Sequence, residues 1–310
     1  MARTQAENTQ RRTILLLGKN GQVGWELQRA LAPLGNVVAL DRAGTDKLCG
    51  DIGNLDGLRA TIAQIKPDVL VNAAAYTAVD QAESEPEQAA TLNHHAPALM
   101  AELMQAQGGC LVHYSTDYVF DGSGNQPWQE ADTTGPLNVY GATKLAGEQA
   151  IQASGCVHLI FRTSWVYASR GNNFAKTMLR LAKERETLNV INDQIGAPTG
   201  AELIADVTAH ALRQWQRQPD TAGTYHLAAS GETSWYDYAR YVFDWAKRAG
   251  LPLAIQSVTP IPSEDYPVPA IRPKNSRLDC HKLETTFNFQ LPSWKKGVER
   301  MLQETSKEPS

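Results

Sequence analysis

Five short apolar runs, each bounded by polar or turn-forming residues, recur along the first half of the chain. They occupy residues 13–17, 36–40, 68–72, 110–115 and 157–163. Unbroken runs of this length are typical of strands buried on both faces of a parallel sheet. Segments with helical periodicity separate them, at about 22–34, 55–65, 97–107 and from about 139 onward. The pattern predicts an α/β fold, a doubly wound parallel sheet that is Rossmann-like.

The pattern loosens in the second half of the chain. We expect helices at about 174–185, 201–214, 235–249 and 293–303, and strands near 188–191 and 225–228. The segment after Val258 should be irregular, because it contains Pro260, Pro262, Pro267, Pro269 and Pro273. Long irregular loops in compact proteins are usually functional. We therefore predict a loose tail (1–12), a dinucleotide-binding domain (13–168) to which later segments return, a mainly substrate-binding region (169–304) and a second tail (305–310).

A glycine-rich stretch follows the first apolar run directly and opens the first predicted helix. It reads Gly18-Lys19-Asn20-Gly21-Gln22-Val23-Gly24. Glycines in this place allow a tight turn and bring the backbone close to a pyrophosphate, whose charge the helix N-terminus stabilises. The stretch therefore indicates a dinucleotide site. A turn that only packs helix against strand is the alternative.

An acidic residue, Asp41, ends the second apolar run about 20 residues past this loop. Such an acid commonly binds the hydroxyls of the adenosine ribose, although Asp is also favoured as a turn cap. Arg42 comes next and could face a 2′-phosphate, so we expect both NADPH and NADH to be used. Asp51 and Ile52 follow at a loop end where they could approach the adenine.

Tyr140 and Lys144 are four residues apart, so on a helix they share one face. A neighbouring ammonium favours the phenolate and can lower a tyrosine pKa of about 10 by roughly 1 to 3 units. Such a tyrosine can give a proton to a carbonyl oxygen. The hydroxyl of Ser115 or Thr116, at the end of the fourth apolar run, would be the second donor to that oxygen. The alternative is a helical tyrosine beside a solvated lysine; Asn138 could cap the helix, as could Thr134.

Composition narrows the classes of function. The chain has 310 residues, of which 42% are hydrophobic, and a net charge of −4. This suits one extended domain or two that share a cleft, and it gives no electrostatic reason to expect nucleic acid or an anionic membrane. We expect neither a membrane span nor a signal peptide. Four widely spaced cysteines without a Cys-x-x-Cys pair favour a reducing cytoplasm and argue against structural zinc.

Taken together, these motifs resemble the extended short-chain dehydrogenase/reductases, from about Arg12 to the last helix. The resemblance is carried by the Gly-x-x-Gly-x-x-Gly loop, by Tyr140 with Lys144, and by three further stretches: Val71-Asn72-Ala73-Ala74-Ala75-Tyr76-Thr77-Ala78-Val79-Asp80, His113-Tyr114-Ser115-Thr116-Asp117-Tyr118-Val119-Phe120 and Arg162-Thr163-Ser164-Trp165-Val166-Tyr167. Within that class the chain is similar to the enzymes that reduce the C4 ketone of dTDP-6-deoxy-L-lyxo-4-hexulose to dTDP-L-rhamnose, a precursor of lipopolysaccharide O-antigens.

The resemblance implies a role for each matching residue. Thr116, Tyr140 and Lys144 would be the catalytic trio, and Thr116, Asp117 and Trp165 would contact the sugar. The implied contacts to NADPH or NADH are Gly18, Gly21, Gln22, Val23, Asp41, Arg42, Asp51, Ile52, Ala75, Tyr76, Thr77, Tyr140 and Lys144.

The resemblance also bears on partners. It implies a dTDP-hexulose substrate and a homodimer, in some members with Mg²⁺ between subunits; Glu26 lies near where such a ligand would come from, and the metal stays open. The dTDP pyrophosphate needs cations, for which Arg272 and Arg277 are candidates. The acidic residues around Asp80 are interpreted as a solvated helix start.

Two other functions fit the same motifs. A nucleotide-sugar epimerase or dehydratase would use the same tyrosine and lysine but would keep its NAD bound through the cycle. The non-catalytic regulatory subunit of methionine adenosyltransferase shares the fold and much of the pattern. The stretch from Ser115 to Phe120 favours the reductase.

Overall fold

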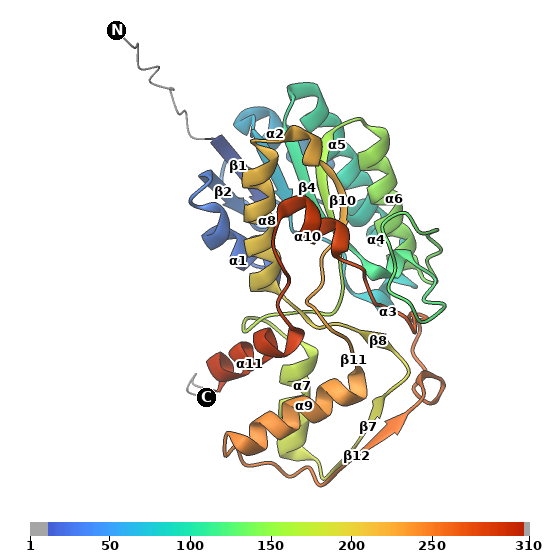
Figure 1. Ribbon diagram of the computed structural model, residues 1–310. Helices are drawn as coiled ribbons and strands as arrows, with labels where there is room; N and C mark the ends of the chain where they lie inside the picture. The colour runs from blue at the N-terminus through green and yellow to red at the C-terminus, as the bar shows by residue number, and fades with distance from the viewer. Residues whose placement is uncertain (1–11, 307–310) are drawn as a thin grey trace.

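The five apolar runs, together with one strand from the second half of the chain, form a six-stranded sheet in the computed structural model, which describes residues 12–306 (Figure 1). The strand order is β10-β5-β4-β3-β1-β2, and every neighbouring pair is parallel. The strands are β1 (Arg12–Leu17), β2 (Gly35–Leu40), β3 (Val69–Asn72), β4 (Cys110–Thr116), β5 (Val157–Thr163) and β10 (Gly223–His226). The predicted fold class is therefore confirmed, with β10 added from the second half of the chain.

Helices cover both faces of this sheet. Because successive strand residues point to opposite faces, Leu16 packs with α1 (Gln22–Leu31), α8 (Ala201–Trp215) and α10 (His281–Phe287), which lie in front of the sheet in Figure 1. Leu15 faces the other way. It packs in the cluster formed by α2 (Leu55–Ile65), α5 (Ala96–Gln107) and α6 (Val139–Ala153). This is the doubly wound arrangement.

A second core lies below the sheet in Figure 1. It is formed mainly by α7 (Phe174–Glu184), α9 (Trp235–Arg248) and α11 (Trp294–Thr305), beside the parallel pair β7 (Thr187–Ile191) and β12 (Ser257–Ile261). The prediction of an irregular segment directly after Val258 was wrong, since β12 contains Pro260. A proline is tolerated there because β12 pairs with a single neighbour, and its other side needs no donor.

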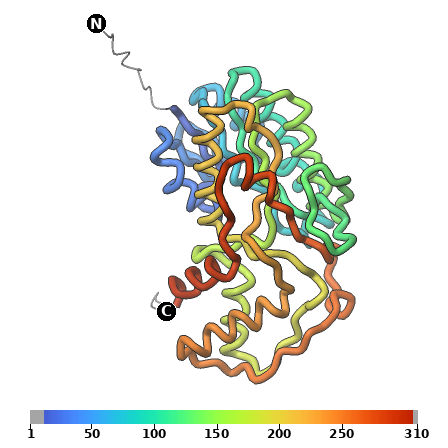
Figure 2. Tube along the Cα trace, in the orientation of Figure 1, coloured from blue at the N-terminus to red at the C-terminus, as the bar shows by residue number. Residues whose placement is uncertain are grey.

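The chain crosses between the two parts more than once. Figure 2 shows the segment after β12 running back beside the sheet, where α10 forms, and then down to α11. The division at residue 168 therefore stays a prediction. Arg12 lies in β1, where it pairs with Gly35 of β2, and Thr305 is the last residue of α11. These two residues therefore do not belong to the loose tails that were predicted. The rest of the predicted tails, apart from Ser306, lies outside the described residues.

Short elements complete the chain. They are α3 (Val79–Ala82), α4 (Pro86–Ala90), the π-helix η1 (Thr91–His95), η2 (Asp117–Val119), β6 (Val166–Tyr167), β8 (Ile195–Gly196), β9 (Thr199–Gly200), η3 (Pro219–Thr221), β11 (Thr233–Ser234) and η4 (Ser263–Asp265). Several of them border the cleft described next.

Candidate active site

One large cleft opens at the carboxyl ends of the central strands. The strand order reverses between β1 and β3, which is where open α/β sheets bind ligands. The cavity volume is about 1590 Å³. Sites for a single drug-sized ligand measure about 300 to 1,000 Å³. The cleft is therefore large enough for a dinucleotide and a second substrate together.

Nearly all predicted site residues line this cleft. They are Gly18, Gly21, Gln22, Val23, Asp41, Arg42, Asp51, Ile52, Ala75, Thr77, Thr116, Asp117, Tyr140, Lys144 and Trp165. Tyr76 is the exception: its side chain is buried, and its hydroxyl donates to Glu85 Oε2 at 2.8 Å. Lining the cleft does not by itself assign a role to any of these residues. The fold does, however, bring together in one cleft segments that are far apart in the sequence.

The glycine loop has the geometry that a close backbone approach requires. Gly18 has φ +86°, and a Cβ there would lie 2.9 Å from the backbone carbon of Ala73. A Cβ on Gly24 would overlap the carbonyl oxygen of Gly18, so the third glycine lets α1 pack on the loop. Gly21 precedes α1, and in the described part of the chain no side chain caps that helix start. The first N–H groups of α1 are thus available to an anion.

The charged groups at the end of β2 pair with neighbours on both sides rather than with each other. Asp41 accepts from Asn20 Nδ2 at 2.7 Å and lies 3.6 Å from Lys19 Nζ, whereas Arg42 contacts Asp51 at 3.3 Å. The Arg42 side chain is 83% exposed. Two cations, Lys19 as well as Arg42, are therefore near the place predicted for the adenosine ribose.

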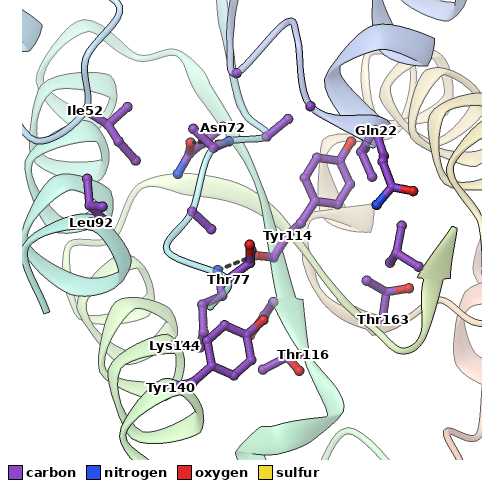
Figure 3. Close-up of a pocket in the computed structure, with 18 of the residues that line it drawn as sticks. Gln22, Ile52, Asn72, Thr77, Leu92, Tyr114, Thr116, Tyr140, Lys144 and Thr163 are labelled. Atoms are coloured by element: carbon purple, nitrogen blue, oxygen red, sulfur yellow. Dashed lines mark hydrogen bonds between the residues drawn. The ribbon is translucent and has the colours of Figure 1, made fainter. Parts of the chain in front are cut away.

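Tyr140 and Lys144 lie side by side on α6, with Thr116 next to the tyrosine ring (Figure 3). The helix begins at the predicted cap Asn138, whose Oδ1 accepts from Gly141 N at 2.8 Å. Lys144 is buried, and its ammonium nitrogen donates to Tyr114 O at 2.6 Å. Burial lowers the pKa of Lys144 to about 8, although Glu148 acts in the opposite direction.

The pKa of Tyr140 moves opposite to the prediction. Burial raises it to about 12; the Thr116 hydroxyl lowers it and the Asp117 charge raises it. Loss of water around the phenol outweighs any effect of Lys144, because desolvation penalises the phenolate. The expected depression of this pKa was wrong for the protein without ligand. The phenol is instead protonated at neutral pH and has a proton to give.

The end of β4 and the start of η2 carry a group of buried oxygens. Thr116 Oγ1 donates to Asp117 Oδ1 at 3.1 Å and accepts from Tyr118 N at 3.1 Å. Burial raises the pKa of Asp117 to about 7. Within residues 12–306, Asp117 Oδ2 and Ser115 Oγ are buried without a hydrogen-bond partner. Buried polar atoms of this kind are usually paired, so both suit a polar ligand.

Trp165 is held as a rigid wall of the cleft by groups that the sequence analysis did not single out. Its φ is +47°, a conformation that non-glycine residues rarely adopt. Its ring stacks on Trp235 with centroids 3.6 Å apart, and a Cβ on Gly196 would lie 2.8 Å from it. Trp235 also lines the cleft and donates to Gln194 Oε1 at 3.1 Å. No local sequence pattern could predict this contact, because Trp235 is 70 residues further along the chain.

The arginines proposed for the pyrophosphate are both occupied by carboxylates. Arg272 binds Asp80 through two nitrogens, at 2.7 and 3.1 Å, and Arg277 Nε donates to Glu232 at 2.6 Å. Asp80 does lie in the first turn of α3, and its side chain is 41% exposed, as interpreted from the sequence; its ion pair with Arg272 was not predicted. Neither arginine borders the cleft.

The structure gives the Mg²⁺ expectation no support. Glu26 contacts Arg29 at 3.7 Å. Among residues 12–306 no group of three or more His, Cys, Asp or Glu side chains could hold a metal ion. All four cysteines are free thiols. No helix of the described chain is long and apolar enough to cross a membrane.

Comparisons with known proteins agree with this geometry. The family described as RmlD substrate binding domain matches residues 12–307. The dTDP-4-dehydrorhamnose reductase of Escherichia coli (strain K12) is 60% identical over 291 residues, which is 94% of this chain and 97% of the relative.

Solved structures are similar over most of the chain. That of dTDP-4-dehydrorhamnose reductase from Bacillus anthracis str. Ames, in complex with NADP, has a TM-score of 0.84 and 36% identity, and covers 95% of this chain and 100% of its own. A UDP-glucose 4-epimerase from Thermus thermophilus, in complex with NAD, has a TM-score of 0.78 with 17% identity over 96% of this chain and 100% of its own, so it shows the fold alone. These matches confirm the resemblance that the motifs indicated, and the chain belongs to the RmlD substrate binding domain family.

Proposed function

We propose that this chain catalyses the NAD(P)H-dependent reduction of the C4 ketone of dTDP-6-deoxy-L-lyxo-4-hexulose to dTDP-L-rhamnose. The observation that carries the proposal is one cleft lined by a glycine loop at one end and by Thr116, Tyr140 and Lys144 at the other. A ketone reductase needs both parts within reach of one another. The 60% identity to a reductase of this name supports the same substrate.

The residues at the glycine loop fit a nicotinamide dinucleotide. The uncapped start of α1, which Gly21 precedes, suits the pyrophosphate, and Asp41 suits the adenosine ribose. When bound, such a cofactor supplies the hydride. Lys144 would hold its nicotinamide ribose.

Tyr140 and Thr116 would handle the ketone oxygen. The protonated phenol of Tyr140 gives its proton to the oxygen as negative charge develops there, and Thr116 donates a hydrogen bond to the same atom. Because its pKa is raised, Tyr140 stays protonated at neutral pH until negative charge develops on the ketone oxygen. Thr116 and Lys144 are buried at this end of the cleft, and the exclusion of water there strengthens both interactions.

The sugar would lie between Asp117 and Trp165. Asp117 Oδ2 has no partner among the described residues and can accept from a sugar hydroxyl. Trp165, fixed by its stack on Trp235, offers a flat apolar face. A carboxylate oxygen at Asp117 and an apolar ring at Trp165 suit a sugar, which has both hydroxyl groups and apolar C–H groups.

The proposal extends to the cofactor choice and setting. Asp41 beside the cations Lys19 and Arg42 suits either NADH or NADPH, so both should serve. We also propose that the protein is a homodimer, as the family resemblance implies. The four free cysteines favour the reducing cytoplasm as its location. Light scattering of the purified protein tests the dimer.

The test is to mix the purified protein with NADPH and the dTDP-hexulose and to identify the sugar by NMR. We expect dTDP-L-rhamnose, with one NADPH oxidised for each molecule formed. An isomerised sugar without net oxidation of NADPH would indicate an epimerase instead. No sugar conversion, with tight binding to a methionine adenosyltransferase, would indicate the regulatory subunit.

A further inference from the structure

A chain of hydrogen bonds runs beneath the cleft to Lys144. Ala74 N donates to Asn72 Oδ1 at 3.1 Å, and Asn72 Nδ2 lies 3.2 Å from His113 Nδ1. His113 Nε2 in turn lies 3.1 Å from Lys144 Nζ, which donates to Tyr114 O at 2.6 Å. Asn72, His113 and Lys144 are each at most 2% exposed. These three side chains are therefore almost completely shielded from bulk water.

The direction of each hydrogen bond follows from the backbone. The N–H of Ala74 can only donate, so the side-chain oxygen of Asn72 must face it and the Asn72 amide nitrogen must face His113. That nitrogen is a donor, so His113 Nδ1 must accept. A neutral imidazole that accepts at Nδ1 carries its proton on Nε2. His113 therefore presents an N–H to Lys144.

A donor facing Lys144 favours one form of the lysine. An ammonium has three donors and no acceptor, whereas the amine has a lone pair that can accept from His113. We propose that Asn72 and His113 are positioning residues that favour the neutral amine of Lys144 in the enzyme without cofactor. Each residue acts through the next, and neither touches the reacting atoms.

The groups around Lys144 agree with this assignment. On α6 the acid is Glu148, whose carboxylate is bound by Arg162 at 2.7 and 3.0 Å. Glu148 is the charge that raises the pKa of Lys144, yet burial outweighs it and brings that pKa to about 8. Burial is the main cause that holds the pKa of His113 well below its ordinary value, so the imidazole stays neutral even when Lys144 carries no charge.

Other elements packed against α6 act elsewhere. Asp117 of η2 raises the pKa of Tyr140, and on η1 burial and the neighbouring His95 lower the pKa of His94. Glu85, between α3 and α4, is bound by Tyr76 and Gln81. His113 is therefore the titratable side chain that bonds Lys144 directly.

The consequence concerns the proton donor. An ammonium at Lys144 would favour the phenolate of Tyr140, whereas an amine leaves the phenol protonated. The Asn72–His113 pair thus increases the fraction of enzyme, at pH values around and above 8, in which a protonated Tyr140 stands beside a neutral amine. This link to catalysis rests on the proposed reduction, but the charge of Lys144 does not, so it can be tested without substrate.

The test is a pH titration of the lysine side chains by NMR in ¹³C-lysine-labelled protein without cofactor, with the Lys144 signal assigned from its loss in Lys144→Met. In the original protein the titration midpoint of Lys144 should lie near 8. Asn72→Asp should raise it by at least about one pH unit, because a carboxylate accepts from Ala74 and from His113 Nδ1 and so turns a lone pair of Nε2 toward Lys144.

His113→Leu, which removes the donor, should raise the midpoint in the same direction. His158→Gln is the matched control, because His158 lies on β5 and bonds only the carbonyl of Cys156; it should leave the midpoint unchanged. An original midpoint at the ordinary value of about 10.4 would overturn the proposal. So would a folded Asn72→Asp protein with an unshifted midpoint, even if His113→Leu does not fold. Failure to form dTDP-L-rhamnose would reject the proposed reduction and leave this result standing.

Discussion

The two ends of the cleft hold charges in different surroundings. At the end of β4 and on α6, Lys144 and Asp117 are each 2% exposed, and their pKa values move toward neutrality. At the end of β2, Arg42 is 83% exposed and binds Asp51 across the surface. Desolvation makes each interaction strong at the first end, and solvent screens it at the second. Substitutions at the buried end should therefore have the larger effects.

The largest effect is expected from Tyr140→Phe. Removing the proton donor should lower kcat at least roughly 100-fold, the usual size of a general-acid contribution, with cofactor affinity nearly unchanged. Steady-state kinetics and NADPH fluorescence titration measure the two quantities. Tyr225→Phe is the control, since its hydroxyl bonds Thr221 O at the sheet edge, away from the cleft. Retained turnover in Tyr140→Phe would remove this residue from the mechanism.

Asp117→Asn should stabilise the fold in a pH-dependent way. Because burial raises the pKa of Asp117 to about 7, the native protein holds a proton that the unfolded chain releases above about pH 3.9. Stability from this proton is full below that value and is lost as the pH rises through 7. At pH 8 the variant should be more stable by on the order of 2 kcal/mol, and the difference should shrink at pH 4.

Urea unfolding at both pH values measures this difference. Asp121→Asn is the control: Ser123 holds the pKa of Asp121 below its usual value, so the stability that this carboxylate contributes is lost only as the pH falls through that lowered pKa. This variant should therefore lose stability at pH 8 and, to a slightly smaller degree, at pH 4. If Asp117→Asn changed the free energy of unfolding equally at both pH values, the buried carboxyl would not be titrating as described.

Trp165→Ala should weaken the use of substrate without weakening NADPH binding. Losing the stacked indole should raise KM or lower kcat by about tenfold, a typical cost for an aromatic contact. Gly196→Ala should act in the same direction, because its new Cβ would press on the Trp165 ring. Trp215→Phe, on the far surface near Arg12, should have no effect. A fall in NADPH affinity in Trp165→Ala would contradict the assignment.

The smallest effects are expected at the exposed end. Asp41→Ala should shift preference toward NADPH, and Arg42→Ala toward NADH, each within about tenfold or 1.4 kcal/mol. The contact of Lys19 with Asp41 adds a third substitution, Lys19→Ala, with the same direction as Arg42→Ala. The ratio of kcat/KM for the two cofactors decides the matter, with Arg59→Ala as a surface control. If no substitution moves the ratio, the ribose does not bind at the end of β2.

Features set by local sequence were predicted well. The predicted helix at 55–65 is α2, the strand at 157–163 is β5, and Asn138 does cap α6. In each case apolar periodicity or a cap is encoded within a few residues. The position of the glycine loop, directly after β1 and directly before α1, was predicted for the same reason.

Features set by distant partners were not predicted. Pro260 was taken as a strand breaker, but pairing with β7 about 70 residues earlier overrides it. The ion pair of Asp80 with Arg272 was not predicted, because these two residues are 192 positions apart in the sequence. The Tyr140 pKa was predicted from Lys144 alone, because burial depends on the whole fold. His113 lies in one of the stretches that carry the family resemblance, but no role could be predicted for it because its contact with Asn72 depends on the pairing of two strands.

Transfer of deuterium tests the central claim most directly. With NADPH deuterated at the transferable position of the nicotinamide, the dTDP-L-rhamnose formed should carry deuterium at C4, and NMR would show the loss of that proton signal. Such a product requires the ketone carbon and the dinucleotide to meet within one site, as a single cleft lined by both groups of residues allows. dTDP-L-rhamnose without deuterium at C4, formed while NADPH is consumed, would contradict the account.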